Sequence, residues 1–151
     1  MAVDFSEFEK FKNQLKDLEK ELPAFEEECA KELGARLLRE VRQKTPVGIY
    51  PEESGKMGGT LRRNWYVTDA RRTSEGYALD VINNTEYASY VEDGHRQQVG
   101  RYVPAIGKRL KQPWVEGKHM LKDSVDDIQS KADAIIERRM NRWLEEKMNG
   151  K

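Results

Sequence analysis

The stretch NNTEYASYVEDGHR, residues 83–96, sets three large side chains at helical spacing inside a polar run. Tyr90 and Val91 follow Tyr87 by three and four positions, which places all three on one face of a helix. Gly94 suits the end of that helix, because glycine readily adopts the left-handed conformation found at helix C-termini. We predict a short helix that Tyr87, Tyr90 and Val91 anchor onto a sheet, with Gly94 turning the chain sharply.

A histidine at the end of this stretch raises a second interpretation. Glu92, His95 and His119 could form the metal or acid–base site of a hydrolase, since these side chains bind metal ions and transfer protons. The 24 positions between the two histidines, without HxxxH or HExxH spacing, give this alternative no support. A histidine after a helix end more often bonds to the last carbonyls. We therefore expect no catalytic residue, cofactor or metal.

Working outward, the chain begins with two helical segments. Residues 4–22 carry an apolar stripe and can be capped by Asp4 or Ser6. Pro23 then interrupts or restarts the helix. A second segment follows over about 24–44. The apolar positions of both are Phe5, Phe8, Phe11, Leu15, Leu18, Leu22, Phe25, Cys29, Leu33, Leu37 and Val41. We interpret Cys29, the only cysteine, as a small core residue.

The rest of the chain alternates loops with short elements. Glycine and proline make 46–60 a long loop. Residues 61–83 look like a β-hairpin with a TSEG turn, and Thr85 or Asn84 can cap the short helix over 86–92. Residues 95–117 indicate a loop flanked by short strands, and a last helix covers 118–148.

This order predicts one α+β domain over residues 1–151. Long N- and C-terminal helices (1–44 and 118–148) pack on a small, mainly antiparallel sheet region (61–117) with one short helix between strands. No signal peptide or apolar stretch of membrane-spanning length is visible, so we expect a protein made in the cytoplasm that has no membrane partner.

The charge balance bears on possible partners. Lysine plus arginine and aspartate plus glutamate each number 27, so no net charge attracts nucleic acid. A local patch of Arg62, Arg63, Trp65 and Arg71 could still bind nucleic acid through phosphate contacts and stacking. We keep nucleic-acid binding as an alternative. The zero net charge favours the other interpretation, in which these charges pair with complementary charges on a neighbouring protein.

Several motifs together resemble a known family. They are TPVG (45–48), GTLRRNW (59–65), EYASYVEDGHR (86–96) and WVEGKHML (114–121). In this order they are similar to the tail-completion or head–tail joining proteins of long-tailed bacteriophages. In that family the loop after the TPV motif is usually short, whereas GIYPEESGKMG lengthens it here.

The resemblance implies a structural virion protein of a phage or prophage, not an enzyme, that joins or completes the tail at the neck. It implies a homo-oligomeric ring, hexameric in that family, whose partners are connector or stopper and tail-terminator proteins, with passive contact to DNA in the lumen. We expect loops 46–60 and 96–107 to contact partners. Structural anchors are Tyr87, Tyr90, Val91, Gly94 and Trp114; interface candidates are Ile49, Tyr50, Met57, Arg62, Arg63, Arg96, Arg101 and Tyr102.

Overall fold

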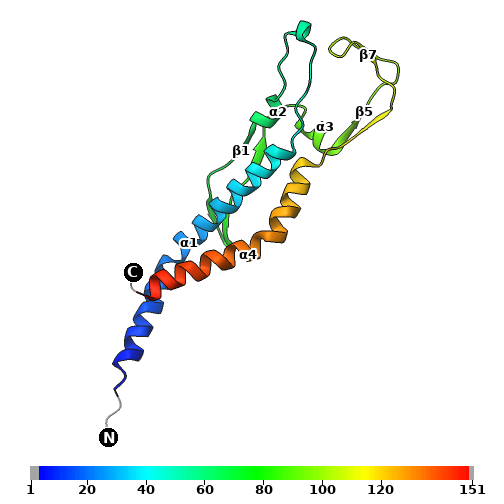
Figure 1. Ribbon diagram of the computed structural model, residues 1–151. Helices are drawn as coiled ribbons and strands as arrows, with labels where there is room; N and C mark the ends of the chain where they lie inside the picture. Colours follow the sequence, from blue (N-terminus) through cyan, green and yellow to red (C-terminus); the bar gives the residue numbers. More distant parts are fainter. Residues whose placement is uncertain (1–3, 150–151) are drawn as a thin grey trace.

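The computed structural model describes residues 4–149 and places two long helices beside short antiparallel strand pairs (Figure 1). The α+β class predicted from the sequence is confirmed. The helices are α1 (Ser6–Lys44), the 3-10 helix η1 (Glu52–Ser54), α2 (Thr60–Arg63), α3 (Ala88–Asp93) and α4 (Met120–Met148). The strands are β1 (Trp65–Val67), β2 (Arg71–Thr73), β3 (Gly76–Ala78), β4 (Val81–Asn83), β5 (Gly94–Arg96), β6 (Tyr102–Val103), β7 (Lys108–Arg109) and β8 (Trp114–Glu116).

Helix α1 is one continuous helix, so the expected break at Pro23 is wrong. The proline has no N–H, which leaves only the carbonyl four residues earlier without its helical donor. That carbonyl belongs to Glu19, an exposed residue that water can reach. The N-cap residue of the helix is Phe5, and Asp4 just before it accepts a hydrogen bond on Oδ1 from the Ser6 N–H at 2.9 Å. The helix ends at Lys44, as the Thr45-Pro46 pair predicts.

The first hairpin, residues 65–83, is confirmed with its TSEG turn but starts later than predicted. Strand β1 pairs with β4 and β2 with β3, all antiparallel, and the two pairs lie end to end in one ribbon. The Thr68 N–H donates to the Asp80 carbonyl at 2.8 Å between them. Residues 60–63 form α2 instead of a strand, because Gly59 adopts φ 94° and starts a helical turn that buries Leu61.

Helix α3 begins at Ala88, two residues after the predicted start. Neither predicted cap uses its side chain; the Ala88 N–H donates to the backbone carbonyl of Thr85 at 3.0 Å. Gly94 ends the helix with φ 87°, as predicted, and begins β5. Strands β5–β8 and β6–β7 then form nested antiparallel pairs, the distal hairpin of residues 94–116, which agrees with the expected loop between short strands.

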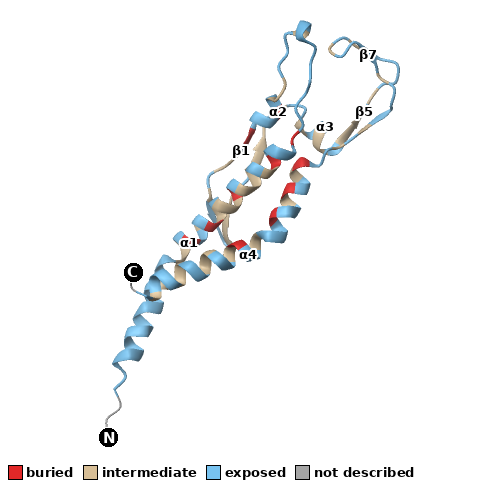
Figure 2. Ribbon diagram, viewed as in Figure 1, coloured by how far each residue is buried: buried red, intermediate tan, exposed pale blue. Residues whose placement is uncertain are grey.

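The core lies where α1, α4 and the first hairpin meet (Figure 2). Val41, Leu61, Trp65 and Met120 form its centre, and Val91 of α3 packs against it. Nearer the start of α1, a second buried group forms against α4 and consists of Phe25, Cys29, Ile128 and Ile135. Cys29 is therefore a core residue, as predicted, and burial raises the pKa of its thiol.

Candidate protein-partner interface

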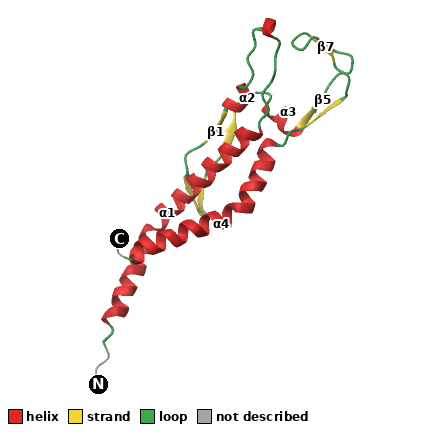
Figure 3. Ribbon diagram, in the orientation of Figure 1, coloured by secondary structure: helices red, strands yellow, loops and turns green. Residues whose placement is uncertain are grey.

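Two long loop segments project from the end of the molecule opposite the start of α1 (Figures 1 and 3). One is the loop 46–60 that carries η1, and the other is the distal hairpin 94–116. We call these two segments together the distal crown. Loops presented on a rigid scaffold commonly carry function, so the crown is the candidate interface.

The base of loop 46–60 is held by backbone contacts that only glycine permits. A Cβ added to Gly58 would lie 1.9 Å from the Gly48 carbonyl oxygen, so the two arms of the loop touch there. Arg62 Nη2 donates to the Thr45 carbonyl at 2.8 Å, and Arg63 Nη1 donates to the Gly58 carbonyl at 3.2 Å. These two arginines, expected at a partner contact, thus already hold the start and end of the loop.

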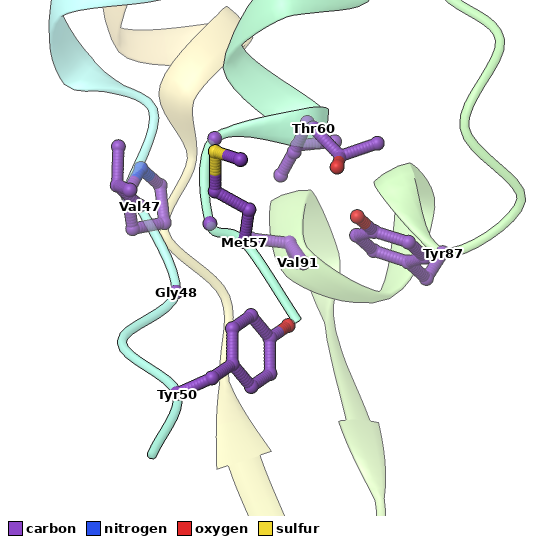
Figure 4. Close-up of a pocket in the computed structure, with 11 residues that line it drawn as sticks. Val47, Gly48, Tyr50, Met57, Thr60, Tyr87 and Val91 are labelled. Atoms are coloured by element: carbon purple, nitrogen blue, oxygen red, sulfur yellow. The ribbon is translucent and has the colours of Figure 1, made fainter. Parts of the chain in front are cut away.

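Above this base lies a cavity of about 240 Å³ between the loop, α2 and α3 (Figure 4). Tyr50 and Met57 face it from the two sides of the loop, Tyr87 faces it from the position just before α3, and Val91 from α3 itself. Most of this lining is apolar, and no charged residue takes part. The cavity can therefore accept an apolar side chain but offers no acid–base chemistry.

A second hollow, of about 520 Å³, connects the two segments of the crown. It is lined by Ile49, Tyr50, Pro51, Ile106 and Lys108. At its edge Ile49 is 93% exposed, and Met57 further along the loop is 81% exposed. Apolar side chains this exposed are unusual on a free surface when they gather together, and they mark interaction sites.

The predicted anchors occupy different environments. Val91 packs on the core, whereas Tyr87 is partly exposed and Tyr90 is 58% exposed. Tyr90 contacts the ring of His95 edge-on, with centroids 5.8 Å apart. The exposed Trp114 lies against Gly94, where an added Cβ would come within 2.9 Å of its Cζ2. Among the three helix positions, Val91 makes the core contact.

Glu92 has a structural role that sequence reasoning missed. Its Oε2 accepts from the Leu121 N–H at 2.9 Å and its Oε1 from the Lys122 N–H at 3.0 Å, so it caps α4 from α3. The adjoining backbone adds a bond of 2.7 Å from the Lys118 N–H to the Val91 carbonyl. The sequence held no local signal for this cap, because 29 residues separate Glu92 from Leu121.

Glu92, His95 and His119 do not form the metal site that the hydrolase alternative requires. Both carboxylate oxygens of Glu92 bind α4, and within residues 4–149 no cluster of three His, Cys, Asp or Glu side chains could hold a metal ion. His119 is the N-cap residue of α4 with φ 48°. The Nδ1 atom of His95 is buried and makes no hydrogen bond within the described residues, so this atom does not form the expected bond to the helix carbonyls.

The alternative nucleic-acid patch is not assembled either. Trp65 is buried, and its Nε1 donates to Thr45 Oγ1 at 2.8 Å, so its ring cannot stack on a base. Arg71 pairs with Asp80 at 2.8 Å on the first hairpin, and Arg62 holds the Thr45 carbonyl. The arginines of this patch serve the fold.

Comparison with known proteins decides the family. Residues 9–94, more than half of the chain, match the family described as "Bacteriophage HK97-gp10, putative tail-component". The chain belongs to this family. The resemblance inferred from the sequence motifs is thereby confirmed, and a role as a phage tail component follows. The matched region of this tail component contains α1 from residue 9 onward, loop 46–60, the first hairpin and α3.

One curated relative of the tail component is the "Uncharacterized protein YqbI" of Bacillus subtilis (strain 168). It is 30% identical over an alignment of 95 residues, with a coverage of 49% of this chain and 57% of the relative. The chain thus spans just over half the length of that relative. No solved structure matches. Across residues 4–149 of the tail component, every helix is too short or too polar to cross a bilayer.

The motifs that carried the resemblance converge on one junction of this tail component. Thr45 of the TPVG motif accepts the Trp65 hydrogen bond of the GTLRRNW motif, while Val91 and Met120 come from the other two motifs. Residues of these four motifs thus contribute to the core that supports the crown.

Proposed function

We propose that this tail component joins or completes the tail at the neck of a tailed phage or prophage particle, as a non-enzymatic subunit of a ring. The observation that carries the proposal is the distal crown. Two segments of this chain project from one end and expose apolar side chains that the chain itself does not cover. Its site of action is then the virion.

The geometry supports docking by a rigid element. Thr45, Trp65 and Arg62 tie the end of α1 to the first hairpin directly below loop 46–60. Glu92 ties α3, and with it the start of the distal hairpin, to α4. Because both segments rise from this bonded junction, their bases are fixed before binding, which lowers the ordering cost of association.

The interface residues are then those whose side chains lie on the crown. Ile49, Tyr50 and Met57 present apolar contacts, and the exposed Tyr102 stacks under Arg109, whose Cζ is 6.0 Å from the ring centroid. Arg96 and Arg101 are exposed on the distal hairpin. Aromatic, methionine and arginine side chains are enriched at protein interfaces, which agrees with this set.

The test is genetic. The gene is deleted from the phage or prophage that encodes it and is restored as wild type, as Ile49→Asp with Met57→Asp, or as Glu137→Ala. Glu137 is an exposed α4 residue outside the crown and serves as the matched control. We expect heads and tails that fail to join in the deletion and in the crown variant, seen by electron microscopy, and infectious particles with the control.

Infectious particles in the complete absence of the protein would refute the joining role. Full activity of the crown variant would instead show that partners bind elsewhere on the molecule. Circular dichroism of the purified crown variant checks its fold, which both substitutions should preserve because Ile49 and Met57 have almost no packing to lose.

A further inference from the structure

The N-terminal part of α1 projects past the rest of the molecule (Figure 1). Helix α4 ends beside Glu21, which pairs with Lys147 at 2.6 Å. Beyond that point, residues 5–17, which we call the N-terminal arm, carry a bare apolar stripe. Its members, all exposed, are Phe5, Phe8, Phe11 and Leu15, with Phe8 at 63%.

This stripe is the continuation of an intramolecular packing seam. The same helical spacing leads to Phe25, which stacks on Trp143 of α4 with ring centroids 4.7 Å apart, and to the buried Cys29. The bare part exposes on the order of 500 Å² of apolar surface, given the area that phenylalanine side chains present. A patch of that size is at the upper end for a monomer and is often functional.

The tip of the arm is also acidic. Residues 4–10 contain Asp4, Glu7, Glu9 and one cation, Lys10, which pairs with Glu7 at 3.2 Å, so their net charge is −2. Two such tips repel each other, which opposes a contact between two arms laid side by side in the same direction. The occupant of this stripe should therefore be apolar and basic.

The distal crown is both apolar and basic. Loop 46–60 has two acids and one lysine (−1), and the distal hairpin has five cations and one acid (+4), which together give +3. Within residues 4–149, none of those five cations forms a salt bridge. The salt bridges that do form among these residues lie along α1, α4 and the first hairpin. The five cations are Arg96, Arg101, Lys108, Arg109 and Lys111.

The apolar component of the crown distinguishes a protein partner from nucleic acid. The hollow between the two segments is walled by Ile49, Pro51 and Ile106, with Lys108 beside them. Nucleic-acid interfaces are polar and rely on phosphate contacts, so they leave such walls unused. A helix tip that alternates phenylalanine with carboxylates matches both the walls and the lysine.

We propose that the acidic aromatic tip of one copy docks into the crown of a second copy, with a phenylalanine of the tip in the hollow between Ile49 and Ile106. This inference rests on the proposed ring and names the contact that builds it. Two different patches meet, so the contact is heterologous, the type that generates rings when the rotation between copies closes.

The experiment uses two variants of the full chain. The tip variant is Phe8→Ser with Glu9→Gln, and the crown variant is Ile49→Ser with Lys108→Gln. All four side chains are exposed, and circular dichroism with thermal unfolding confirms that both variants fold like the wild type. Sedimentation velocity measures association of the wild type, of each variant alone, and of their equimolar mixture.

We expect the wild type to self-associate and each variant alone to do so at least about 30-fold more weakly, the loss expected for a central interface residue. The mixture should form a dimer and stop there, because the crown variant supplies an intact tip and the tip variant an intact crown. An arm-to-arm contact predicts instead that the crown variant alone self-associates like the wild type, because its arm is intact.

Three results would overturn the inference. They are a wild type and mixture that stay monomeric at the highest soluble concentration, self-association that persists in the tip variant, and a mixture that does not dimerise. If the crown instead binds a short DNA duplex with steep salt dependence, the crown faces nucleic acid and not a second copy. Each of these leaves the joining role standing, since that role is tested by particle assembly.

Discussion

Replacing Glu92 with alanine should weaken the attachment of α4 to the rest of the molecule. The carboxylate accepts two hydrogen bonds, at 2.9 and 3.0 Å, from N–H groups in the first turn of α4. A lost helix cap costs about 0.5–2 kcal/mol, and the interaction of a negative charge with the helix dipole adds about 0.3–1 kcal/mol. Because Glu92 is half-buried, screening by solvent is incomplete, and we expect a loss of about 2 kcal/mol.

Thermal unfolding followed by circular dichroism measures this loss. For a chain of this length, about 2 kcal/mol lowers Tm by roughly 4–8 °C. Glu92→Gln keeps one acceptor oxygen and should lose about half as much. Glu86→Ala, an exposed glutamate just before α3, is the control and should change Tm little. If Glu92→Ala unfolds at the same temperature as the control, the carboxylate does not hold α4 and the reasoning is refuted.

Three further changes test the packing below the crown. Trp65→Phe removes the buried bond to Thr45 and should cost about 1–2 kcal/mol in urea unfolding; an unchanged midpoint would contradict that role. Gly34→Val should cost about 1–3 kcal/mol of stability, because the new Cβ would lie 2.7 Å from the side chain of Leu79 in the first hairpin and overpack that contact. The same change at the next residue, the exposed Ala35, is the control and should be near neutral. The Arg139 guanidinium holds the pKa of Glu32 below its ordinary value, so this pair contributes fully at neutral pH and its contribution is lost as pH falls through that lowered pKa. Stability between pH 7 and pH 3 should thus fall less in Glu32→Gln than in the wild type, and equal losses would refute the pairing.

The sequence predicted what depends on local periodicity and missed what depends on distant contacts. The apolar spacing of α1 and α4 and the Gly94 stop were predictable because each is encoded within a few residues. The continuity of α1 through Pro23 was not, since the packing of Phe25 on α4 stabilises the helix on the far side of the proline. The cap on α4 depends on Glu92 far along the chain, so no sequence window contains it.

In the candidate interface, too, locally encoded features were predictable and long-range contacts were not. That loop 46–60 would be exposed followed from its glycines and prolines. The bonds from Arg62 and Arg63 to backbone carbonyls at the base of the loop could not be predicted in this way. An arginine next to an aromatic residue in the sequence can equally belong to a binding patch or hold the backbone in place. Only the geometry distinguishes the two uses.

The closed base of loop 46–60 explains how an extended loop is compatible with this fold. The two arms already touch at Gly48 and Gly58, and arginines fix both ends, so the added residues lie outside the bonded junction. Loop-closure entropy rises slowly with length, by about 0.6 kcal/mol for each doubling. Lengthening the loop therefore costs the core little while it raises Ile49 and Met57 toward the end of the molecule. Stability and contact thus depend on different residues, so substitutions on the crown or the arm should alter assembly while the Trp65 core remains folded.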